Sequence, residues 1–169
     1  ISRMLSEGTI IALSTPQGSG ALGVIRISGS LAFEKTALFF APKSNKKVVF
    51  TPKKAQLGEF RVGDEILDEV VLTSYVAPHS YTGEDCVELT CHGSPFILQQ
   101  IIANYLKVGL LPAQPGEFTL RAYLNQKMDL SQSESVADLI ASESEAAHRV
   151  AIQQLRGGYS AEMEHLRQD

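Results

Sequence analysis

Apolar and polar residues alternate through much of the first half of the chain, a pattern typical of β-strands with one buried face. The alternation predicts strands over residues 9–14, 24–28, 55–62 and 66–75. The last two are expected to form a hairpin that turns at Gly63 and Asp64. The segment 43–54 is expected to be an exposed, lysine-rich loop around a short strand at 48–50.

The stretch from Ser80 to Gly93 combines a turn with a strand. Thr82 and Gly83 favour a chain reversal. The strand that follows is expected to have two faces, one with Val87, Leu89 and Cys91 and the other with Cys86, Glu88, Thr90 and His92. Strands rarely carry a carboxylate at mid-length, so Glu88 either lies on a solvated face or binds something.

A 3.6-residue apolar period predicts helices over 31–40, 96–107 and 117–124. Ser94 is the expected N-cap of the second of these helices, with Pro95 at its first position.

A long amphipathic helix is predicted from Ser131 to about Arg156, because Ser131 and Glu134 have the spacing of a capping box. Gly157 and Gly158 are expected to end it, and another helix is expected from near Ser160 onward. So long an apolar face needs partner helices, which the chain hardly supplies.

Two domains are therefore expected in an α+β fold, a mixed α/β domain over 1–114 and a truncated all-helical segment over 115–169.

Composition narrows the range of functions. The 169 residues include 15 Lys and Arg against 19 Asp and Glu, a net charge of −4, which argues against this chain alone binding a phosphate backbone. The lysine-rich segment 43–54 also lacks the interleaved aromatic residues of a nucleic-acid groove. With no apolar run of membrane-spanning length and no signal peptide, a soluble, cytoplasmic protein is expected.

Two motifs that could indicate a metal ion or a dinucleotide do not have the geometry that such a site requires. Cys86 and Cys91 lie an odd number of residues apart on one strand, so they are expected neither to pair nor to share a metal ion. The glycine pattern at 18–23 fits a G-x-G-x-x-G, but a strand follows it rather than a helix, so it is interpreted as a turn. Arg26 lies on that strand, facing away from its isoleucines.

Several segments resemble, in order, the start of the MnmE (TrmE) family of tRNA modification GTPases. These are PQGSGALGVIRISG, SYTGEDCVELTCHG, QPGEFTLRAYLNQKMDLSQSESVADLIASESEAA and LRGGYS. The chain departs from the family pattern at Gln17 and Ser19, and 43–61 is too divergent to carry anything over.

The resemblance implies a tetrahydrofolate-binding domain similar to that of aminomethyltransferases, followed by the start of a helical domain. Residues matching the family's folate contacts are Arg26, Glu88 and Lys127. The cofactor implied is 5-formyl- or 5,10-methylene-tetrahydrofolate. A pterin presents an N–H beside an amine, which suits a carboxylate such as Glu88, and the anionic or carbonyl parts of folate suit Arg26 and Lys127.

By the same resemblance, the protein forms a homodimer through its N-terminal domain and works with MnmG, an FAD protein. Together they add an aminomethyl or carboxymethylaminomethyl group to C5 of the wobble uridine, U34, of tRNA. GTP, Mg²⁺ and K⁺ belong to a GTPase domain that this chain lacks, because no G-x-x-x-x-G-K-[ST] occurs in it. The fragment alone is expected not to hydrolyse GTP, and no membrane partner is expected.

Two alternatives stay open. The chain is a free-standing folate-dependent aminomethyltransferase in the first, and a dimerisation module without a ligand in the second. Folate titration separates the second alternative from the others, and the length of the intact gene separates the first from a GTPase fragment.

Overall fold

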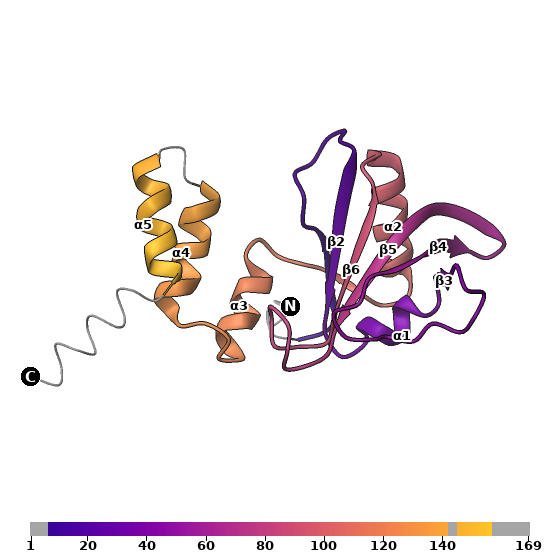
Figure 1. The fold of residues 1–169 in the computed structure, drawn as a ribbon, viewed down its shortest axis with the longest axis horizontal. Coiled ribbons are helices and arrows are strands. Elements are labelled where there is room, and N and C mark those ends of the chain that lie inside the picture. Colours follow the sequence, from indigo (N-terminus) through magenta and orange to yellow (C-terminus); the bar gives the residue numbers. More distant parts are fainter. Residues whose placement is uncertain (1–6, 142–144, 157–169) are drawn as a thin grey trace, which may run out of the picture.

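The computed structural model describes residues 7–141 and 145–156. Within these residues, the chain forms a mixed seven-stranded sheet with the strand order β3-β4-β5-β6-β2-β1-β7, with two helices between its strands and three after them (Figure 1). The strands are β1 (Ile10–Leu13), β2 (Leu22–Ser28), β3 (Phe40–Pro42), β4 (Gln56–Val62), β5 (Glu65–Tyr75), β6 (Cys86–His92) and β7 (Leu111–Pro112). The helices are α1 (Ala32–Thr36), α2 (Pro95–Lys107), α3 (Glu117–Leu124), α4 (Leu130–Ala141) and α5 (Glu145–Leu155).

The strands expected over 9–14, 24–28, 55–62 and 66–75 are confirmed as β1, β2, β4 and β5. β4 and β5 form the expected antiparallel hairpin, and Gly63 at its turn has a left-handed φ of 60°. The glycine-rich loop does lead into strand β2, as interpreted, and Gly20 packs so closely on Gly93 that a Cβ at Gly93 would lie 2.2 Å from the Gly20 carbonyl oxygen.

The hydrophobic core lies between α2 and one face of the sheet. Leu98, Ile101 and Tyr105 of α2 are buried there against the inward residues of the central strands, among them Ile25 and Leu89. Ser94 caps α2 as expected, its side chain accepting a hydrogen bond from the amide of Ile97 at 3.5 Å. Burying each such side chain is worth about 1.5–3 kcal/mol, so α2 is the main cover of the sheet.

Two predictions between β2 and β4 are wrong. The helix expected over 31–40 is only α1, because Phe40 instead begins β3 and lies opposite Phe60 of β4 in the core. The strand expected at 48–50 does not form; the ring of Phe50 instead stacks on that of Phe33, with 4.7 Å between the ring centroids. In both places burial of an aromatic ring decided the local structure over propensity.

The prediction of one long helix from Ser131 is also wrong, because the structure has two helices, α4 ending at Ala141 and α5 beginning at Glu145. The capping box is Asp129 with Gln132, each side chain accepting from the other's backbone amide, at 2.7 Å and 3.0 Å. The two helices lie side by side (Figure 1), and Gln132 donates to the carbonyl of Leu155 at 3.1 Å. Thus α5 supplies part of the cover that α4 needs.

The expectations for Gly157, Gly158 and the helix near Ser160 concern residues outside those described. Among the described residues, no helix is long and apolar enough to span a bilayer.

Candidate functional site

A polar row crosses the face of the sheet that α2 does not cover. Arg26 on β2 lies opposite Ala12 on β1 and Glu88 on β6, and Glu88 lies opposite Thr73 on β5. These four residues are half-buried, whereas their neighbours along β2 and β6, Ile27 and Leu89 among them, are buried on the α2 side. The sheet thus presents charged groups at mid-strand on a face partly open to solvent.

Arg26 and Glu88 form an ion pair on this face. The Nε of Arg26 donates to Oε1 of Glu88 at 3.1 Å, and their side chains are 26% and 29% exposed. The guanidinium carbon of Arg26 lies 5.1 Å from the ring centroid of Tyr81 and 5.5 Å from that of Phe118. Two aromatic rings therefore flank the cation, and the carboxylate stays accessible beside it.

The rings come from the turn before β6 and from α3. The hydroxyl of Tyr81 lies 2.9 Å from that of Thr119, which joins the turn to the helix next to Arg26. Beside Glu88, burial and then the negative charge of Glu88 raise the pKa of the Tyr75 phenol. Tyr75 therefore stays protonated at neutral pH and able to donate a hydrogen bond.

Lys127 lies in the loop after α3, and its side chain is exposed. This loop packs on the turn that carries Tyr81: Asn125 donates to the carbonyl of Thr82 at 2.8 Å, and a Cβ at Gly83 would lie 3.2 Å from Cγ of Lys127. Gly83 also has a left-handed φ of 81°. The turn therefore requires glycine both for this backbone conformation and because a side chain would have no room.

The structure therefore brings Arg26 and Glu88 into direct contact and places Lys127 beside Gly83, which lies in the turn that also carries Tyr81. Within the described part of the chain, no hydrogen bond or ion pair joins Lys127 to Arg26 or Glu88. Lys127 instead lines a hollow of about 570 Å³ with residues of α3 and of the loop before α4.

An ionic cluster of Arg121, Glu84 and Glu117 joins α3 to the sheet domain and was not predicted from the sequence. Arg121 of α3 is 1% exposed and donates to Glu84 at 3.1 Å, to Glu117 at 3.2 Å and to the carbonyls of Gly8 at 2.7 Å and Glu7 at 2.9 Å. Ser28 of β2 also donates to Glu84, at 2.8 Å.

The cluster attaches α3, and with it Phe118, to the sheet. The spacing of Glu117 and Arg121, four residues apart on one helix, was the sequence signal for it. The boundary at 114/115 stays a prediction, and these contacts favour grouping α3 with the sheet domain.

Cys86 and Cys91 both lie on β6. Both are buried free thiols, and burial, together with the charge of Asp68, raises the pKa of Cys91 to about 12. No cluster of three metal-ligating side chains occurs in the described residues.

His92 and Asp68 form a second charged pair, at the end of β6. The Nδ1 of His92 lies 2.7 Å from Oδ1 of Asp68, whose other oxygen accepts from the His92 amide at 2.9 Å. The hydrogen bond to Asp68 and then its charge raise the pKa of His92, although burial opposes the shift.

This pair predicts a pH dependence of stability. Protonated His92 is stabilised in the folded state, so its contribution is fully present below the unfolded pKa of about 6.5 and is lost as pH rises through the raised folded pKa. Urea unfolding between about pH 5.5 and 8.5 should show the midpoint falling across this window. In His92→Gln the fall should be smaller, and an identical pH profile in this variant would exclude the pair as its source.

Comparisons with known proteins agree on one family. The family model described as "GTP-binding protein TrmE N-terminus" matches residues 9–127. The tRNA modification GTPase MnmE of Christiangramia forsetii is 51% identical over 167 residues, which cover 98% of this chain and 35% of that protein. The protein of the same name from Bacteroides fragilis is 51% identical over 166 residues, covering 97% and 36%, and that of Cytophaga hutchinsonii is 50% identical over 160 residues, covering 95% and 34%.

Proposed function

The chain belongs to the family of TrmE N-terminal domains, and we propose that it is the folate-binding and dimerising part of a tRNA modification GTPase. It spans about a third of the length of the curated relatives it matches, 35% in the first case. The contribution proposed for these residues is to bind the ligand and the partner chain.

The Arg26–Glu88 pair carries this proposal. A half-exposed carboxylate, a guanidinium and two aromatic rings on one face match the chemistry of a folate, which has a pterin with adjacent donors, flat rings and an anionic tail. In this assignment Glu88 accepts hydrogen bonds from the pterin, while Arg26 and Lys127 neutralise carbonyl or carboxylate groups. Bound folate supplies the one-carbon unit.

The role proposed for the complete protein is based on the relatives' name, tRNA modification GTPase MnmE. With MnmG, an FAD protein, the complete protein adds an aminomethyl or carboxymethylaminomethyl group to C5 of U34 in tRNA. A free-standing aminomethyltransferase is less favoured, because the relatives that match nearly all of this chain are about three times as long.

Isothermal titration of the chain with 5-formyltetrahydrofolate tests the proposal. Saturable binding is expected at one site per chain. A folded chain that takes up no folate would favour the ligand-free dimerisation module instead.

We also predict that the chain is a homodimer. Besides the family relationship, apolar side chains line an uncovered hollow of about 570 Å³ between α3 and α4, among them Leu120, Leu130 and Val136. Light scattering at micromolar concentration should give the mass of two chains, and a stable dimer should bury more than about 1,000 Å² in total. The mass of a single chain at that concentration would contradict the prediction.

A further inference from the structure

The segment 43–54, here called the lysine loop, concentrates positive charge in an acidic protein. It contains Lys43, Lys46, Lys47, Lys53 and Lys54 and no Asp or Glu, whereas the whole chain has a net charge of −4. The net charge of the remaining residues is therefore more negative than −4, and the lysine loop is a cationic surface on an otherwise acidic chain.

The lysine loop is fixed on the sheet domain although it contains no strand. Phe50 stacks on Phe33, and Val48 and Phe50 pack against the core. Its backbone bonds to the sheet at both ends: the amide of Lys43 donates to the carbonyl of Leu57 at 3.1 Å, and that of Lys53 to the carbonyl of Ser74 at 2.8 Å. This anchoring holds the backbone of the loop in place, so less backbone conformational entropy is lost when the loop binds a partner.

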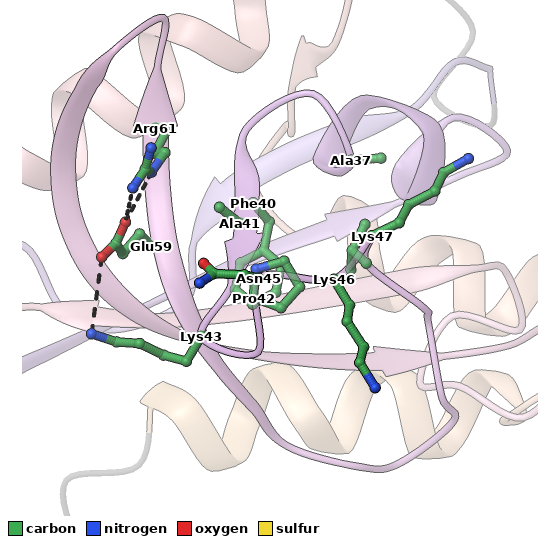
Figure 2. A pocket seen from close by; sticks show the side chains of 11 residues that line it. Ala37, Phe40, Ala41, Pro42, Lys43, Asn45, Lys46, Lys47, Glu59 and Arg61 are labelled. Atoms are coloured by element: carbon green, nitrogen blue, oxygen red, sulfur yellow. Dashed lines mark hydrogen bonds and ion pairs between the residues drawn. The ribbon is translucent and has the colours of Figure 1, made fainter.

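The lysines differ in their pairing. Lys43 lies 3.5 Å from Glu69 and 3.9 Å from Glu59. The other four are exposed, and within the described ranges no carboxylate lies within 4.0 Å of their ammonium groups. Figure 2 shows Lys43 reaching toward Glu59, while Lys46 and Lys47 extend away from it.

Lys43, Lys46 and Lys47 help to line a hollow of about 390 Å³. Its lining includes the apolar residues Ala37, Phe40 and Pro42, with Lys46 and Lys47 at its edge (Figure 2). Lys53 follows Lys47 by six positions, so the two lysine pairs are at most about 22 Å apart along the backbone. Together the two pairs present four exposed ammonium groups, which can meet several phosphates of one nucleic-acid strand.

We propose that the lysine loop docks the phosphate backbone of the tRNA on which the complete protein acts; this rests on the proposed function. Lysine ammonium groups are point charges that bind phosphates without reading bases, which suits a structured RNA recognised through its shape and backbone. RNA is favoured over an acidic protein or an anionic membrane, because the relatives are named for tRNA modification.

Fluorescence anisotropy with labelled tRNA at about 50 mM and about 200 mM salt tests this. The variants are Lys46→Gln/Lys47→Gln and Lys53→Gln/Lys54→Gln, and the control Lys35→Gln/Lys107→Gln removes two lysines elsewhere. Each loop variant should bind tRNA about ten-fold more weakly at the lower salt, and the slope of log affinity against log salt should be less steep by about 1.5. The control should stay near wild type.

Three outcomes would overturn the proposal: equal losses in the loop and control variants, no tRNA binding by the wild type at the lower salt, or lysine-dependent binding to phosphatidylserine vesicles without binding to tRNA. Folate titration of the same loop variants should match the wild type. A chain that binds tRNA through the loop but takes up no folate would refute the folate assignment alone, so the two failures are distinguishable.

Discussion

Replacing Arg121 with methionine is expected to lower the free energy of unfolding by about 3–5 kcal/mol. The substitution keeps an apolar stem of similar length but removes the guanidinium that pairs with Glu117, whose carboxylate is 1% exposed, and with Glu84. The carbonyls of Gly8 and Glu7 lose donors as well. Urea unfolding followed by circular dichroism measures the change.

Arg61→Met is the matched control. Arg61 also pairs with a glutamate, Glu59, at 2.7 Å, but its side chain is 46% exposed, so its loss should cost no more than about 1 kcal/mol. The double variant Glu117→Gln/Arg121→Met should be less destabilised than the sum of its single variants, because it removes both charges. Equal effects of Arg121→Met and Arg61→Met would show that the cluster does not hold α3 on the sheet.

Local patterns predicted the sheet better than the helices. In β5 and β6 the two-residue period is confirmed by alternating burial, because one face packs against α2. The helical period of 131–156 is the same in α4 and α5, so periodicity could not show that these two helices pack against each other. The start of α4 is marked by the capping box of Asp129 and Gln132, which lies two residues before the predicted box of Ser131 and Glu134.

The candidate site was predictable in parts. The period of each strand showed that Arg26 and Glu88 face away from the apolar side, and the family resemblance singled them out. Their contact depends on β2 lying next to β6, a pairing between residues 62 positions apart that no local pattern encodes. Lys127 was identified by resemblance alone, because an exposed lysine in a loop has no distinguishing local signal.

Glu88→Gln is expected to weaken the binding of 5-formyltetrahydrofolate by about ten-fold or more. The amide has nearly the shape of the carboxylate but replaces one acceptor with a donor, which would face the N–H groups of the pterin. A hydrogen bond to a charged group is worth about 1.5–3 kcal/mol, and about 1.4 kcal/mol corresponds to ten-fold in affinity. Arg26→Gln should also weaken binding, both directly and by releasing Glu88 from its ion pair.

Glu69→Gln is the control for this prediction, since Glu69 also lies on the sheet, in β5, and its side chain is 49% exposed beside Lys43. The Arg26–Glu88 pair is partly exposed, so Glu88→Gln should change the free energy of unfolding by no more than about 1 kcal/mol. Weaker folate binding by a variant of normal stability would therefore report on the ligand and not on the fold. If Glu88→Gln and Glu69→Gln both bind folate as the wild type does, Glu88 is only a solvated strand residue and the folate site lies elsewhere.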